Sequence, residues 1–220
     1  MNKIKKEILH ELKEHVPFTA AATLLAVIIT AFLLIKENLI SYAVSMFYIF
    51  HPIHIFFSSI VSAAIFYKYV QNANFGTSKN PTNKTQGFFD KNNIFLALIS
   101  SIIIAVAVGS ISDVIFPYLG SLLFKIPISF HLPAFESPFL ILGTAFFGGI
   151  TGIILRKTKF PHFIHVLISV FASLLYIFAY STSFSLLTII LVFLITSISV
   201  IIPCCLSDIV LPILFGGKKR

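Results

Sequence analysis

The chain has 220 residues, 57% of them hydrophobic and 11% charged, and its formal net charge is +8. So little charge beside so much apolar surface excludes a water-soluble globule and predicts an all-α polytopic membrane protein. The excess of Lys and Arg does not indicate a nucleic-acid partner, because these residues occupy the connections between apolar runs, where charge orients the spans. We expect the protein in the plasma membrane, with the lipid bilayer as its partner.

Six apolar runs are long enough to cross a hydrocarbon core of about 30 Å. They cover residues 17–35, 52–69, 93–111, 137–155, 161–180 and 185–203. The basic residues in the successive connections number 4, 1, 4, 1, 3, 0 and 3. This alternation predicts six spans with both the N- and C-termini in the cytoplasm, since Lys and Arg accumulate on the inner side.

Segments outside the spans have patterns of their own. Residues 1–15 place apolar side chains at helical spacing opposite Lys and Glu, which predicts an amphipathic helix on the cytoplasmic surface. Residues 39–50 are predicted to form a second interfacial helix, and the polar stretch 71–92 a cytoplasmic loop. Residues 218–220 form a basic tail.

A polar motif occurs twice inside the apolar runs, in the form H-x-x-H-x-x-x-S-x-x-x-S. Its members are His51, His54, Ser58 and Ser62 in the first copy and His162, His165, Ser169 and Ser173 in the second. Offsets of 3, 7 and 11 residues place all four side chains of a copy on one narrow face of a helix. A second motif, S-D-x-x-x-P-x-L, begins at Ser112 and Asp113 and again at Ser207 and Asp208.

The motifs follow the same order in both halves, which predicts that residues 16–124 and residues 125–217 are two copies of one unit. A weaker match supports the alignment and pairs His10 with His131 and His15 with Glu136. A unit of three spans is odd, so the second copy must enter the membrane from the opposite side. Inverted repeats of this kind are typical of secondary transporters.

The duplication also predicts where the polar groups lie. The orientation places the first pair of histidines toward the outside and the second pair toward the cytoplasm. The apolar segments after Asp113 and Asp208 are too short to cross the membrane. Each is predicted to be either a re-entrant half-helix or an interfacial helix lying flat, and the sequence favours neither.

Ionisable side chains inside a membrane are costly and tend to mark ion paths or binding sites. No Lys or Arg lies in the interior of a span, which argues against a carrier of anions. Imidazole and carboxylate ligands suit Zn, Mn, Fe, Co or Ni, so we expect a divalent metal ion as substrate or bound ion. The expected ligands are His51, His54 and Asp113 in one copy, and His162, His165, Asp208, Cys204 and Cys205 in the other.

The thiols occur only in the second copy, on the predicted cytoplasmic side. Soft ligands there favour export of the metal, and imidazole groups could exchange protons for it. Further polar side chains are expected to support the sites. These are Ser58, Ser62, Ser112, Ser169, Ser173, Ser207, His131, Glu136, His10, Glu14 and His15.

Other interpretations remain open beside metal transport. An intramembrane zinc hydrolase of a lipid or amide would use histidines to hold zinc and Asp to activate water, with Ser58 or Ser169 near the substrate. The duplication argues against it, because an enzyme needs one competent centre. Alternatively, the serines serve helix packing, and the chain is a structural subunit without metal. A homo-oligomer is compatible with each interpretation.

Overall fold

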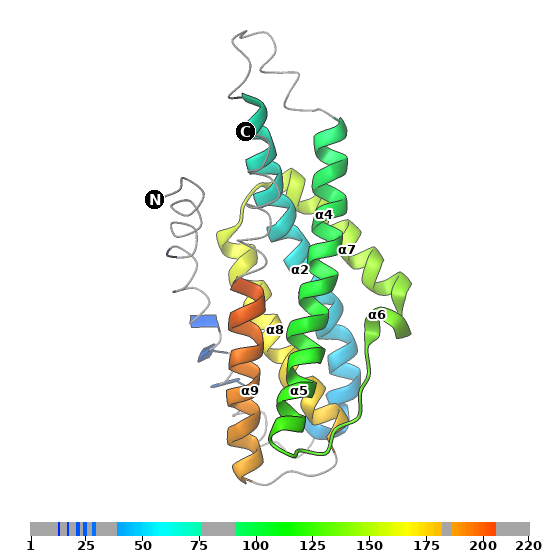
Figure 1. The fold of residues 1–220 in the computed structure, drawn as a ribbon, viewed down its shortest axis with the longest axis vertical. Helices are drawn as coiled ribbons and strands as arrows, with labels where there is room; N and C mark the ends of the chain where they lie inside the picture. The colour runs from blue at the N-terminus through cyan, green and yellow to red at the C-terminus, as the bar shows by residue number, and fades with distance from the viewer. Residues whose placement is uncertain are drawn as a thin grey trace.

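The computed structural model describes residues 39–75, 91–181 and 186–205, together with eight positions between residues 13 and 29. This part of the chain is all-helical and forms no strand, as the composition predicts (Figure 1). Its elements are α2 (Leu39–Phe75), α4 (Lys91–Ser110), the π-helical turn η2 (Ile111–Ile115), α5 (Phe116–Leu123), α6 (Pro133–Glu136), α7 (Pro138–Leu155), α8 (Lys159–Tyr180) and α9 (Leu186–Cys205).

Four helical stretches are long and apolar enough to cross a membrane. They are Tyr42–Tyr67, Ile94–Leu123, Pro138–Leu155 and Phe160–Tyr180, which contain the second to fifth predicted spans or nearly all of each. The sixth predicted span corresponds to α9, which contributes the shorter apolar stretch Ile190–Val200. The first predicted span, the cytoplasmic helix over residues 1–15 and the basic tail lie largely or wholly outside the described residues.

Helix α2 is continuous over 37 residues, although the sequence predicted an interfacial helix and a separate span on either side of Pro52. Proline removes one backbone N–H donor and often ends or bends a helix. Here the residues before Pro52 are held in the bundle by packing, because Ala43 and Phe47 are completely buried in the main hydrophobic core. Residues 39–50 therefore belong to the helical bundle rather than to a separate surface helix.

Helices α4 and α5 form one rod joined by the π-helical turn η2 (green in Figure 1). Backbone angles remain helical through the junction, at −64° and −40° for Ser110 and −68° and −44° for Phe116. The re-entrant half-helix predicted after Asp113 is therefore not formed, and these residues instead lengthen the third span to Leu123. The corresponding segment after Asp208 lies outside the described residues.

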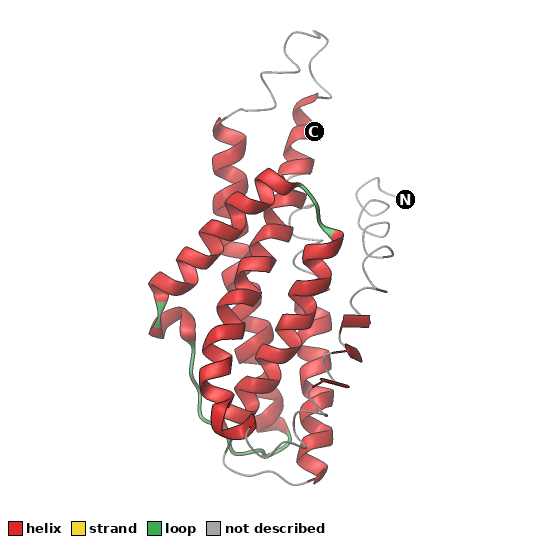
Figure 2. Ribbon diagram, turned by 180° about the vertical axis from the view of Figure 1, so that it is seen from behind, coloured by secondary structure: helices red, strands yellow, loops and turns green. Residues whose placement is uncertain are grey.

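The long helix α2 lies at the centre and packs against α4, α7 and α8, while α9 packs against α8 and α5. Chain direction, followed by colour in Figure 1, shows that α2 and α8 run antiparallel. Glycines allow α7 to approach α2 closely: a Cβ added to Gly148 or Gly152 would lie 2.3 Å from the carbonyl oxygen of Phe56 or Ile60. The loop between α5 and α6 runs along the side of the bundle (Figure 2).

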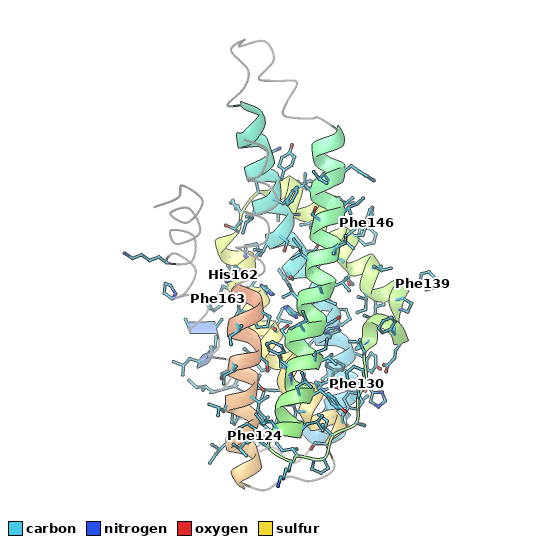
Figure 3. The ribbon with its side chains drawn as sticks, viewed as in Figure 1. Phe124, Phe130, Phe139, Phe146, His162 and Phe163 are labelled. Atoms are coloured by element: carbon cyan, nitrogen blue, oxygen red, sulfur yellow. The ribbon has the colours of Figure 1, made fainter. Side chains whose placement is uncertain are left out.

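The bundle buries polar side chains and exposes large apolar ones, the reverse of a water-soluble protein. Phe139 is 91% exposed, and Phe146 also lies on the outer surface of α7. His162, by contrast, is completely buried among the helices (Figure 3). An apolar exterior suits contact with lipid, and the buried polar groups mark the interior as the place to look for function.

Candidate metal centre

The repeated polar motifs lie on the facing surfaces of α2 and α8. All eight of their side chains are completely buried. Two helices with one polar face each can enter a membrane together only if those faces are turned toward protein rather than lipid. The helical spacing of the motifs therefore predicted the direction in which these side chains point.

His51, His54 and Asp113 form a compact group at the centre of the bundle. The Nδ1 atoms of His51 and His54 lie 2.8 and 2.6 Å from the same carboxylate oxygen, Oδ2 of Asp113. One ligand atom from each of the three residues falls within 4.8 Å of the others. Asp113 comes from the π-helical turn η2, which belongs to a different rod from the two histidines. Two histidines and one carboxylate are a donor set typical of divalent transition metals.

The other carboxylate oxygen of Asp113 also accepts hydrogen bonds. Its Oδ1 accepts hydrogen bonds from the hydroxyls of Ser112, at 2.9 Å, and Ser169, at 2.8 Å. The Ser173 hydroxyl contacts the backbone carbonyl oxygens of Ser112 and Ser169 at 3.0 and 2.8 Å. These contacts tie the η2 turn, which carries the carboxylate, to α8. Charge-assisted hydrogen bonds of this kind offset the cost of burying the carboxylate.

The histidine rings can present ligand atoms in two ways. With Nδ1–H donated to Asp113, each ring carries its lone pair on Nε2, and the carboxylate acts as the group that orients a histidine ligand. In His51 this Nε2 is buried and has no hydrogen-bond partner among the described residues. In the other neutral tautomer, with the proton on Nε2, the Nδ1 lone pairs face Asp113, and each of the three residues can offer one donor atom to the same ion. Either arrangement uses only His51, His54 and Asp113.

The second pair of histidines meets the first pair rather than forming a separate site. The rings of His54 and His165 are stacked, with centroids 4.6 Å apart and planes inclined by 10°. The His162 ring follows at 5.5 Å from that of His165. The two expected ligand sets are therefore in contact with each other, through His54 and His165. The antiparallel helices cross at the level of both motifs, so the four imidazoles form one cluster.

Several predicted residues lie elsewhere or outside the described part of the chain. Ser58 and Ser62 are buried on the polar face of α2. Cys204 and Cys205 end α9, but only their backbone is described. The remaining candidates outside the described residues are Ser207, Asp208, His10, Glu14 and His15.

His131 and Glu136 form a second, partly exposed group near the ends of α2 and α8. His131 Nδ1 lies 3.1 Å from Glu136 Oε1, and the Tyr48 hydroxyl donates to Glu136 Oε2. Burial raises the pKa of Glu136, but the hydrogen bonds from Tyr48 and His131 outweigh it and hold the pKa below its ordinary value. The carboxylate is therefore charged at neutral pH.

The sequence interpretation missed the aromatic residues that continue the polar faces. Phe47 precedes His51 by four residues on α2, and Tyr176 and Tyr180 follow Ser173 by three and seven on α8. Phe47 contacts both tyrosines, at centroid distances of 5.3 and 6.0 Å. Extending the same helical spacing by one or two turns would have found all three.

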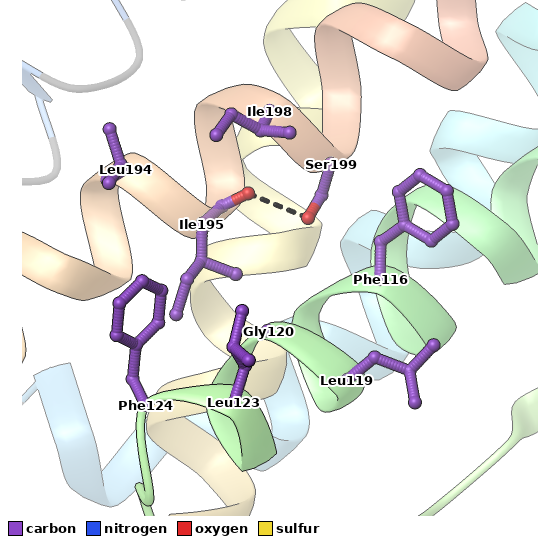
Figure 4. A pocket seen from close by; sticks show the side chains of 9 residues that line it. All are labelled: Phe116, Leu119, Gly120, Leu123, Phe124, Leu194, Ile195, Ile198 and Ser199. Atoms are coloured by element: carbon purple, nitrogen blue, oxygen red, sulfur yellow. Dashed lines mark hydrogen bonds between the residues drawn. The ribbon is translucent and has the colours of Figure 1, made fainter.

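A cavity of about 380 Å³ lies apart from the histidine cluster, between α5 and α9 (Figure 4). Its lining is apolar except for Ser199, whose hydroxyl is already bonded to the Ile195 carbonyl oxygen at 2.7 Å. None of its lining residues is titratable. This cavity offers no ligands for a metal ion and no group for acid–base chemistry.

No protein-family model, curated protein or solved structure matches this chain. The geometry of the described residues is therefore the basis for assigning a function. Apolar helices long enough to span a membrane enclose a His–His–Asp group with the donor atoms of a metal site. These features fit a metal-binding protein of the membrane.

Proposed function

We propose that the chain is an integral membrane transporter of a divalent transition-metal cation and that His51, His54 and Asp113 bind the cation. The observation that carries the proposal is the convergence of these three side chains, all completely buried, inside a bundle of apolar helices. A buried carboxylate and two imidazoles are costly in a membrane protein that serves structure alone. A metal-binding role explains why the chain retains them.

The stacking of His54 on His165 supports a role for both motifs. The two histidines hold the same position in their respective copies, and they meet where antiparallel helices cross. Equivalent residues in contact are expected close to a pseudo-twofold axis in the membrane plane, the symmetry of an inverted repeat. In an exporter the second pair would pass the cation to the first when the halves exchange conformations.

The hydrolase alternative has less support. A lipid or amide substrate would have to reach Asp113, which is completely buried and already bonded to four side chains. The apolar cavity between α5 and α9 includes none of the three proposed metal ligands. A single metal ion needs far less space than such a substrate, which favours ion transport.

The test uses the purified full-length protein, dialysed separately against Zn²⁺, Mn²⁺ and Co²⁺ and analysed for bound metal by mass spectrometry. We expect stoichiometric binding of at least one ion and its loss in His54→Ala. The matched control is Ser59→Ala, which changes a buried side chain of the same helix that bonds instead to the Ala145 carbonyl oxygen. In metal-loaded proteoliposomes, His54→Ala and His165→Ala should both abolish flux. Normal flux in both variants would remove the assignment.

The proposal also includes the direction of metal transport and the orientation of the chain in the membrane. The thiols of Cys204 and Cys205 favour export, since soft ligands on the cytoplasmic side would capture the metal there. The distribution of Lys and Arg supports cytoplasmic termini in the plasma membrane. Accessibility of a cysteine added after residue 220 to an impermeant thiol reagent, in sealed cells, tests this orientation. Labelling without permeabilisation would contradict it.

A further inference from the structure

The partly exposed pair formed by His131 and Glu136 has the chemistry of a cation site. Their side chains are 42% and 36% exposed, so a hydrated ion can reach them. A carboxylate, an imidazole and the Tyr48 hydroxyl converge there. Oxygen and nitrogen donors at a solvent-accessible position bind a divalent cation weakly and exchange it rapidly, in contrast to a buried ligand set.

Backbone contacts hold this group against α8. The Ser129 amide donates to the Tyr180 carbonyl oxygen at 3.2 Å, and the His131 amide donates to the Tyr176 hydroxyl at 3.2 Å. The His131 ring stacks on the Tyr180 ring, with centroids 4.3 Å apart. The position of His131 is therefore set by the bundle and not by the loop alone.

Phe47 connects this group to the buried metal ligands. Its ring makes an edge contact with Tyr48, with centroids 5.7 Å apart, and stacks on His51 at 5.4 Å. Phe47 is completely buried. Since Tyr48 bonds to Glu136 and His51 bonds to Asp113, one apolar ring lies in the contact path between an exposed carboxylate and a buried one.

We propose that Glu136, His131 and Tyr48 form the outer access site for the divalent cation, and that the Phe47 ring closes the way between this site and His51. The inference rests on the proposed function and names the route to its binding site. The carboxylate attracts the cation from water, whereas an apolar constriction excludes a hydrated ion until the ring moves. The structure thus corresponds to the state closed on this side.

A purely structural role for the same contacts predicts different behaviour. If His131 and Glu136 only fasten the loop to the helices, their substitution lowers stability without changing the rate of metal binding. If Phe47 only fills space, any neighbouring aromatic residue of α2 has the same effect. Phe50 is the matched control, because it lies one turn further along α2 and packs on Phe171 at a centroid distance of 5.6 Å.

The experiment measures Co²⁺ association and dissociation by stopped-flow absorption on the purified full-length protein in detergent. In Phe47→Ala both rates should rise about tenfold or more while the equilibrium constant changes little, since opening a gate leaves the ligands intact. Phe47→Leu should give intermediate rates and covers the case in which the alanine variant does not fold. Phe50→Ala should match the wild type.

The outer access site is tested separately by Glu136→Gln, which keeps the size of the side chain and one acceptor oxygen but removes the negative charge. The association rate should fall about tenfold at low salt, and the difference should shrink as salt screens the charge. Unchanged association in this variant, or equal rates in the Phe47 and Phe50 variants, would overturn the inference while leaving the metal site in place. A wild-type protein that binds no Co²⁺ removes the proposed function and the outer access site with it.

Discussion

Replacing Asp113 with Asn tests the centre of the site with the smallest change in volume. The carboxylate accepts hydrogen bonds at both oxygens, from His51 and His54 at one and from Ser112 and Ser169 at the other. Asparagine retains one oxygen and presents an NH₂ group to the two donors at the other position. Two hydrogen bonds to a charged acceptor are lost, each contributing about 1.5–3 kcal/mol. The free energy of unfolding should therefore fall by about 3–6 kcal/mol.

The effect on metal binding should be larger than the effect of losing a supporting contact. Removal of a group that merely orients a ligand weakens affinity about 10- to 100-fold, so removal of Asp113 should cost at least about 100-fold. The assay is unfolding with and without Co²⁺, because saturation at about 100 times the dissociation constant adds about 2.7 kcal/mol to the wild type. Asp113→Asn should show no such gain at that concentration. Wild-type metal stabilisation in this variant would refute the assignment of Asp113 to the site, and unchanged stability without metal would refute the calculated cost.

Three further predictions concern the surroundings of the site. Gly152→Ala should lower the free energy of unfolding by about 1–3 kcal/mol, because the added Cβ would clash with the α2 backbone. In the control Gly143→Ala the Cβ enters open space, and the free energy of unfolding should rise by up to about 1 kcal/mol. Equal effects of the two substitutions would contradict the close approach of α7 to α2. Ser169→Ala should weaken Co²⁺ binding about 10- to 100-fold in a titration, while Ser59→Ala should reduce only stability, and a similar affinity in both would separate Ser169 from the site. The pKa of Glu136 is lowered, so its contribution to stability is present above its ordinary pKa of 4.5 and is lost as the pH falls through the lowered value. The melting temperature of the wild type should therefore fall in acid more than that of Glu136→Gln. The same pH dependence of the melting temperature in both proteins would contradict this prediction.

The helical spacing of the polar residues was enough to predict much of the site. An α-helix turns by a fixed angle per residue, so the positions of His51, His54 and Ser58 already placed them on one face. The cost of exposing such a face to lipid then required it to point inward. His51, His54 and Asp113 were accordingly chosen as one ligand set, and the structure brings these three side chains together.

Local geometry could not predict which helices meet or at what height. The π-helical turn that carries Asp113, and the continuity of α2 through Pro52, depend on packing between helices distant in the sequence. The half-helix predicted after Asp113 rested only on the short apolar length of that segment. In the structure the segment continues the preceding helix, so the span runs from Ile94 to Leu123.

The amino-acid sequence alone determined the class of protein and the direction of its polar faces, because both follow from composition and from the constant period of the helix. The tertiary structure decided that His54 stacks on His165 and that Phe47 covers His51. These contacts depend on the antiparallel register of α2 and α8. That register is set by close packing over the whole bundle, and no single stretch of sequence contains it.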